Sequence, residues 1–180
     1  MQWKRKIIVT KKEFMNCVGN GREDILQQML DLLKEMKVDY CVIGGLAVNA
    51  YVEPVVSLDL DLVVVTEAKE NLLKAAEKIF HIEKFPHSVN LTSTKSDLRI
   101  QLQTDPRYQT FIAHSSIKAV MDYEMKVAAV EDVLQGKIWA YSDEQRRKSK
   151  RQKDLADIFR LVESYPHLKD LLPESLRTEF

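Results

Sequence analysis

The hydrophobic pattern at the start of the chain predicts a helix, a strand and a glycine turn in succession. Between residues 24 and 37 apolar residues recur every three or four positions, so this segment is expected to form an amphipathic helix with Asp24 as its N-cap. The apolar run 39–43 predicts a strand that ends at Gly44 and Gly45, and a short helix is expected after this pair. A glycine turn therefore stands between a strand and a helix N-terminus.

The middle of the chain has the pattern of one helix and several strands. The helix is expected at residues 67–80. Strands are expected wherever apolar residues alternate or run together, at 58–65, 82–85, 89–92, 98–103 and 124–130. Because the middle strands follow one another too closely for helical crossovers, a mixed sheet fits this pattern better than an alternating parallel one.

The last third of the chain is expected to be helical, with helices at 130–141, 150–163 and 168–177. The fold class predicted from the whole pattern is α+β: a mixed β-sheet with flanking helices, followed by C-terminal helices. A chain of 180 residues without an obvious flexible linker is expected to form a single domain, with a core over residues 24–130 and a helical portion over residues 130–180.

Composition and charge narrow the class of protein. The 27 Lys and Arg residues cancel the 27 Asp and Glu residues, which argues against a surface coated in basic residues for nonspecific nucleic-acid binding. No apolar run approaches the roughly 18 residues of a membrane span, and the short apolar run behind the basic start is too short for a secretory signal. Cys17 and Cys41 have no CxxC spacing and no neighbouring zinc-ligand cluster. The sequence thus predicts a soluble, cytoplasmic protein with no membrane contact.

Asp59 and Asp61 are the most informative polar residues in the predicted sheet. On a strand, residues two apart share a face, so these carboxylates are expected side by side, with Leu58, Leu60 and Leu62 pointing into the core. Adjacent carboxylates repel each other unless a positive charge lies between them, and Mg²⁺ or Mn²⁺ bound by both would supply that charge. The alternative, from the residues alone, is a solvated polar face on an edge strand.

The two glycines and the two aspartates together form a recognisable pattern. Residues 44–51 read GGLAVNAY, and residues 57–61 read SLDLD. This combination resembles the signature of the nucleotidyltransferase superfamily related to polymerase β. Further along, residues 134–137 and 150–158 are similar to the later motifs of the abortive-infection toxin branch of that superfamily.

The resemblance implies a site and an activity. It implies a metal-dependent transfer of a nucleoside monophosphate from a nucleoside triphosphate to a hydroxyl of RNA, protein or a small molecule, and an antitoxin-type partner. The metal ligands that it implies are Asp59 and Asp61. The nucleotide-binding residues that it implies are Gly44, Gly45, Ser57, Lys137 and Asp154. Lys137 is also expected to assist catalysis, together with the two aspartates, by neutralising charge in the transition state.

The patterns around Lys137 and Asp154 leave two interpretations open for each residue. Lys137 falls where the apolar stripe of its predicted helix calls for another apolar residue, so it either binds phosphate or packs its stem and extends its ammonium into water. Asp154 follows Lys150 by four residues and Arg151 by three, so ordinary ion pairs within the helix would account for its carboxylate without any role in binding nucleotide.

One departure from the family pattern bears on activity. Many active members have a third carboxylate on a neighbouring strand, and the corresponding position here is Gln101. Glutamine cannot act as a general base at neutral pH. The runner-up function is therefore a catalytically weak or inactive nucleotide-binding module on the same fold, and a purely structural interaction domain is the third possibility.

Two other features remain undecided by the sequence. Residues 146–153 are densely basic, which is typical either of a solvated surface or of a site for a polyanion such as tRNA. The four histidines lack metal-ligand spacing and are expected on the surface or in loops.

Overall fold

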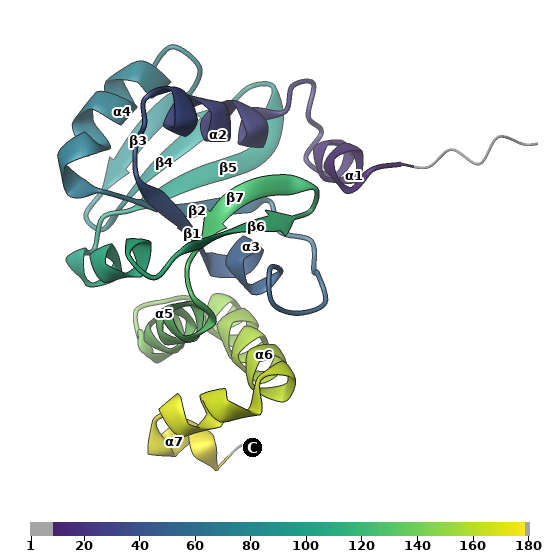
Figure 1. The fold of residues 1–180 in the computed structure, drawn as a ribbon, viewed down its shortest axis with the longest axis vertical. Helices are drawn as coiled ribbons and strands as arrows, with labels where there is room; N and C mark the ends of the chain where they lie inside the picture. Colours follow the sequence, from purple (N-terminus) through teal and green to yellow (C-terminus); the bar gives the residue numbers. More distant parts are fainter. Residues whose placement is uncertain (1–8, 179–180) are drawn as a thin grey trace, which may run out of the picture.

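A mixed β-sheet forms the centre of the protein (Figure 1). The computed structural model describes residues 9–178, so the basic start of the chain lies outside the described residues. Within that range the sheet has seven strands in the order β3-β4-β5-β2-β1-β7-β6. The strands are β1 (Tyr40–Ile43), β2 (Asp59–Val64), β3 (His81–Phe85), β4 (Ser88–Ser93), β5 (Ser96–Gln103), β6 (Ser116–Val120) and β7 (Tyr123–Val127).

Helices pack on the sheet and extend beyond it. In Figure 1, α2 and α4 lie over the teal strands β3–β5, whereas α5, α6 and α7, coloured green to yellow, stack below the sheet. The α-helices are α1 (Lys11–Val18), α2 (Ile25–Glu35), α3 (Gly44–Val48), α4 (Lys69–Ala76), α5 (Val130–Ser142), α6 (Lys148–Ser164) and α7 (Glu174–Arg177). Three 3₁₀ helices join them within the described residues: η1 (Thr66–Ala68), η2 (Pro106–Ile112) and η3 (Pro166–Leu171).

The predicted fold class is confirmed. β2 runs parallel to β5 and antiparallel to β1, so the sheet is mixed, as the closely spaced middle strands indicate. The register places Asp59 opposite Arg99 and Asp61 opposite Gln101. Strand β2, with both carboxylates, therefore lies in the interior of the sheet between β1 and β5 rather than at an edge.

Local signals explain most of the predicted elements. Asp24 caps α2 by accepting a hydrogen bond from the backbone N–H of Gln27 at 3.0 Å. Helix α5 begins at Val130, where the helical C-terminal portion was expected to start. In β2, Leu60 and Leu62 are fully buried, but Leu58 precedes the strand and is partly exposed, so its predicted burial in the core is wrong.

Helix α1 and strand β6 have no counterpart in the prediction, nor does the 3₁₀ helix η2. Helix α1 is short and mostly exposed, and its start is stabilised by a capping box between Thr10 and Glu13 rather than by a buried stripe. Strand β6 lies at the edge of the sheet, and its Ile117 is 67 % exposed. Its sequence therefore lacks the alternation of buried apolar and exposed polar residues from which a strand is predicted. None of the helices within residues 9–178 has both the length and the apolar character needed to cross a bilayer.

Candidate active site

The Gly44-Gly45 pair lies directly against the side chains that follow it in the predicted motif. Gly44 has φ of +69°, and a Cβ placed on it would lie 2.0 Å from Oδ2 of Asp61. A Cβ on Gly45 would lie 3.1 Å from Oγ of Ser57. Gly44 is thus required both by its left-handed backbone at the turn and by the close approach of Asp61, whereas Gly45 is constrained only by the Ser57 side chain.

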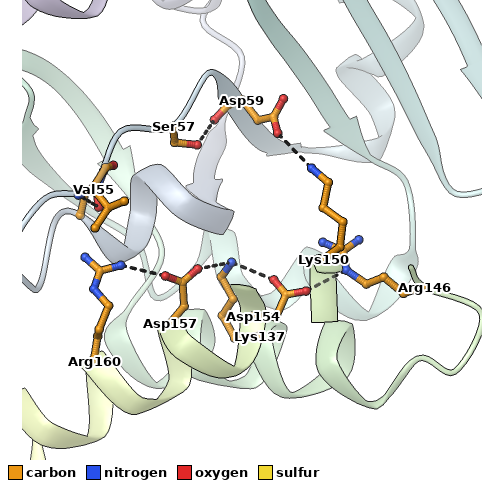
Figure 2. Close-up of polar contacts among 10 residues, drawn as sticks. Val55, Ser57, Asp59, Lys137, Arg146, Lys150, Asp154, Asp157 and Arg160 are labelled. Atoms are coloured by element: carbon orange, nitrogen blue, oxygen red, sulfur yellow. Dashed lines mark hydrogen bonds and ion pairs between the residues drawn. The ribbon is translucent and has the colours of Figure 1, made fainter. Parts of the chain in front are cut away.

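Asp59 already has cationic partners in the protein. Its Oδ1 accepts from Arg99 Nε at 3.1 Å and lies 3.0 Å from Arg99 Nη2, one strand away on β5. Its Oδ2 lies 3.9 Å from Nζ of Lys150, which reaches across from α6 (Figure 2). The positive charge that the paired carboxylates require is therefore supplied in part by the chain itself, on the Asp59 side.

Asp61 differs from Asp59 in having no such partner. Among residues 9–178, no side chain or backbone group hydrogen-bonds or ion-pairs with its carboxylate. Burial raises the pKa of Asp61 to about 6, and the nearby charge of Asp59 adds to that rise. An ionised Asp61 is therefore poorly compensated by the protein, which is the condition that a bound cation would relieve.

The donor set of the site suits a hard divalent cation completed by substrate. Within the described part of the chain, no group of three or more His, Cys, Asp or Glu residues is placed to hold a metal ion. Two neighbouring carboxylates nevertheless match the usual protein contribution to a Mg²⁺ site, in which phosphate oxygens and water fill the other positions. Asp59 and Asp61 thus fit Mg²⁺ or Mn²⁺ only together with a phosphate-bearing ligand.

A pocket opens in front of Asp61. The cavity has a volume of about 120 Å³, and its wall includes Gly44, Asp61, Gln101, Lys137 and Asp154. A groove of about 450 Å³ adjoins this pocket, because residues such as Tyr108 and Arg146 line both. The structure therefore brings Gly44, Asp61, Lys137 and Asp154 to one cavity, whereas Gly45, Ser57 and Asp59 are not part of its wall.

Lys137 is enclosed by carboxylates. It is 8 % exposed, and its Nζ lies 3.0 Å from Oδ1 of Asp154 and 2.7 Å from Oδ2 of Asp157. Burial alone would lower the pKa of Lys137, but the charges of Asp157 and Asp154 outweigh it and raise the pKa above its ordinary value. The interpretation in which the ammonium extends into water is therefore wrong.

Asp154 also has different partners from those that the helix spacing suggests. Its Oδ2 accepts from Nε of Arg146 at 2.7 Å, and its Oδ1 accepts from Lys137. Lys150 instead faces Asp59, and Arg151 donates from Nε to the backbone oxygen of Tyr141 at 2.6 Å. The predicted ion pairs within the helix are wrong, because both cations are used by groups outside it.

Sequence reasoning did not single out Arg99 and Arg146 as parts of the site. Arg99 could have been found from the parallel pairing of its strand with the acidic strand, which places it opposite Asp59. Arg146 belongs to the basic run 146–153, of which Lys150 also reaches the site. Two residues of the basic run 146–153 therefore pair with carboxylates of the site instead of facing only solvent. These ion pairs do not test binding of a polyanion.

Comparison with known proteins places this geometry in a familiar fold. No protein-family model and no curated protein sequence matches the chain. The solved structure of ANT(2'')-Ia with adenylyl-2''-tobramycin aligns with a TM-score of 0.60 at 16% identity, covering 86% of this chain and 94% of that one. The lincomycin-bound lincosamide adenylyltransferase LnuA aligns with a TM-score of 0.56 at 16% identity, covering 79% and 99%.

A fungal structure extends the comparison. An antigenic nucleotidyltransferase-like protein from Paracoccidioides brasiliensis aligns with a TM-score of 0.51 at 19% identity, covering 83% of this chain and 75% of that one. At these identities the similarity concerns the arrangement of helices and strands, not the chemistry. The chain has the α+β fold of the nucleotidyltransferases.

Proposed function

We propose that this protein is a metal-dependent nucleotidyltransferase, which moves a nucleoside monophosphate from a nucleoside triphosphate to a hydroxyl acceptor. The observation that carries the proposal is the carboxylate of Asp61, which has no hydrogen-bond or ion-pair partner among residues 9–178 and lies against Gly44 beside a second carboxylate, Asp59. Gly44 and Asp61 line a pocket of a fold that known nucleotidyltransferases share. Asp59 and Asp61 would hold Mg²⁺ or Mn²⁺ together with the triphosphate.

The other residues of the site would bind the triphosphate. Gly44 and Gly45 present backbone without side chains, so phosphate oxygens can approach their amides. Ser57, whose hydroxyl lies beside Gly45, would donate a hydrogen bond to a phosphate oxygen. Lys137 and Arg146 bring positive charge to the pocket wall, where negative charge develops on the departing phosphates.

The transfer itself exchanges one phosphorus–oxygen bond for another. The oxygen of the acceptor hydroxyl forms a bond to the α-phosphorus as the bond from that phosphorus to the oxygen bridging to the β-phosphate breaks. Pyrophosphate leaves with the electron pair of the broken bond, and the hydroxyl proton passes to solvent. A bound Mg²⁺ or Mn²⁺ would neutralise negative charge on the phosphates. Asp154 would contribute to nucleotide binding through the two cations that it holds.

The acceptor is proposed to be RNA, a protein or a small molecule. The groove that adjoins the Asp61 pocket offers room for an acceptor beside the reacting phosphate. One structural neighbour is a lincosamide adenylyltransferase, and another was solved with adenylylated tobramycin. Aminoglycosides and lincosamides therefore belong in the panel of acceptors, alongside tRNA and protein substrates.

Transfer of label from each of the four NTPs tests the proposal. The protein is incubated with α-labelled NTP, Mg²⁺ or Mn²⁺ and each acceptor, and labelled product is separated from NTP. Wild-type protein is expected to transfer label, and the Asp59→Asn, Asp61→Asn double variant is expected to lose the activity. The matched control is Asp31→Asn, Asp170→Asn, in which both carboxylates are exposed. Equal transfer by the site variant and the wild type would contradict the proposal.

The runner-up, a nucleotide-binding module without turnover, has one observation in its favour. Gln101 is the register partner of Asp61 on β5 and lines the same pocket, at the place where a third carboxylate was expected. A thermal-shift titration with NTP and Mg²⁺ separates the two functions. Stabilisation without label transfer over long incubation would favour the module, and stabilisation with transfer would favour the enzyme.

The abortive-infection branch and an antitoxin-type partner are part of the proposal. They are supported by the sequence similarity of residues 150–158, which lie on α6 beside the site. Induced expression of wild-type protein in a bacterial host is then expected to slow growth, and Asp61→Asn is expected to restore it. Normal growth at matched wild-type expression would argue against this branch.

A further inference from the structure

Five charged side chains form a cluster between α5, α6 and the loop before β2 (Figure 2). We call it the α5–α6 charge cluster; its members are Lys137, Arg146, Asp154, Asp157 and Arg160. Asp154 bridges Lys137 and Arg146, and Asp157 bridges Lys137 and Arg160. Three cations thus share two carboxylates, which leaves the cluster with one excess positive charge.

The excess charge does not reside on Lys137. This residue is 8 % exposed and faces one carboxylate at 3.0 Å and another at 2.7 Å. Lys137 lines the Asp61 pocket, but the charge of its ammonium is already offset by Asp154 and Asp157, both of which are buried. Lys137 therefore offers a phosphate little net charge, whereas its removal would leave two buried carboxylates short of a partner.

Arg160 is also committed elsewhere. Its Nη1 donates to Oδ1 of Asp157 at 2.8 Å, and its Nη2 donates to the backbone oxygen of Glu53 in the loop before β2. These contacts tie α6 to the segment that leads to Asp59. Arg160 is absent from the walls of both the Asp61 pocket and the adjoining groove.

Arg146 is the arginine of the cluster whose two terminal nitrogens have no acceptor among residues 9–178. Only its Nε is engaged, with Asp154 at 2.7 Å, and among residues 9–178 nothing accepts a hydrogen bond from its terminal nitrogens. Its side chain is 39 % exposed, and it lines both the Asp61 pocket and the adjoining groove. A guanidinium with both terminal nitrogens free can bind two oxygens of one phosphate.

We infer that Arg146 is the cation that contacts the triphosphate, and that Lys137 and Asp154 are positioning residues that hold Arg146 at the pocket. The inference rests on the proposed function, because it assigns a contact to the nucleotide of that function. Asp154 fixes Nε of Arg146 and leaves the rest of the guanidinium for substrate. Lys137 neutralises the remaining charge of Asp154 and so lets that carboxylate stay buried.

Phosphate binding by Arg146 variants tests the contact. Affinities for inorganic tripolyphosphate and for ATP, both with Mg²⁺, are measured by calorimetry for wild type, Arg146→Gln, Arg146→Lys and Arg147→Gln. Arg146→Gln removes charge-assisted hydrogen bonds, so its affinity for both ligands is expected to be about 10- to 100-fold weaker than that of wild type. Arg146→Lys keeps the charge but not the paired donors, so its affinities are expected to lie between those of wild type and Arg146→Gln. Arg147→Gln is the matched control, because Arg147 is the exposed neighbour of Arg146, and it is expected to leave both affinities unchanged.

A double-variant cycle tests the positioning role. Asp154→Asn is expected to weaken tripolyphosphate binding in the wild-type background and to have no further effect in the Arg146→Gln background, because its effect passes through Arg146. Thermal unfolding of each variant checks that it is folded. An undiminished effect of Asp154→Asn in the Arg146→Gln background would overturn the positioning role.

The outcomes separate this inference from the proposed function. If wild-type protein binds ATP and Arg146→Gln binds it equally well, the inference is overturned and the proposed function stands. If Arg147→Gln loses as much affinity as Arg146→Gln, the effect is one of general charge and the inference is again overturned. If wild-type protein binds neither ATP nor tripolyphosphate, the proposed function fails and the inference fails with it.

Discussion

Asp61 and Gly44 lie so close together that no side chain fits between them: a Cβ on Gly44 would lie 2.0 Å from Oδ2 of Asp61. Asp61 is the register partner of Ile43 in the β1–β2 pairing, and Gly44 is the residue that follows Ile43. The turn between β1 and α3 thus leaves the space that the Asp61 carboxylate occupies, and the proposed function depends on that carboxylate.

The first prediction concerns Gly44. Gly44→Ala forces a side chain onto a backbone with φ of +69° and against Asp61, so it is expected to destabilise the protein by about 1–3 kcal/mol and to abolish NTP binding. Thermal unfolding and calorimetry measure the two effects. Gly45→Ala, whose Cβ would meet the Ser57 side chain with Oγ at 3.1 Å, is expected to cost less stability. Equal losses at the two positions would contradict the steric explanation.

The second prediction concerns pH and Asp61. Because folding raises the pKa of Asp61 to about 6, the folded state binds the proton more tightly than the unfolded state. The resulting destabilisation is absent below the unfolded pKa of about 4, grows as the pH rises, and is complete above about 6. In the presence of a chelator, the midpoint of thermal unfolding of Asp61→Asn is therefore expected to lie about 5–11 °C above that of wild type at pH 8. Near pH 3.5 the two midpoints are expected to be equal.

A surface carboxylate provides the control for this measurement. Asp170→Asn is expected to show no such pH-dependent difference, because Asp170 is exposed. A difference between Asp61→Asn and wild type that is constant from pH 4 to pH 8 would show that titration of Asp61 is not its cause.

The third prediction concerns Arg99, which contacts Oδ1 of Asp59, one of the two carboxylates that would hold the metal ion. Arg99→Gln removes the competing cation and is expected to strengthen Mn²⁺ binding by about 3- to 5-fold. Titration of Mn²⁺ followed by electron paramagnetic resonance measures this affinity. Lys150→Gln is expected to have a smaller effect, since Lys150 lies 3.9 Å from Asp59. Weaker Mn²⁺ binding in Arg99→Gln would show that Arg99 orients Asp59 rather than competing for it.

The fourth prediction concerns the stability that Lys137 provides. Lys137→Met leaves Asp154 and Asp157 buried with fewer cations, so the free energy of unfolding is expected to fall by about 3–5 kcal/mol. Urea unfolding measures the change. Lys153→Met, on the exposed face of the same pair of helices, is expected to stay within about 0.5 kcal/mol of wild type. A loss below about 1 kcal/mol in Lys137→Met would mean that the cluster is not tightly coupled.

The fold was largely predictable because its main elements carry local signals. The stripe of α2 and the alternation of β2 each follow from the periodicity of a single segment. Strand β6 escaped prediction because its residues are mostly exposed at the edge of the sheet. The assignment of all 180 residues to one domain stays a prediction.

The sequence by itself determined which groups could meet within one segment: the paired carboxylates of Asp59 and Asp61, and the glycine turn before α3. Their spacing sets their relation, because a strand places alternate residues on one face. Only the tertiary structure decided which cation neutralises which carboxylate. Arg99, Lys137 and Arg146 have long side chains whose partners lie on other elements, so sheet register and the packing of α5 against α6 select among pairs that sequence spacing cannot rank.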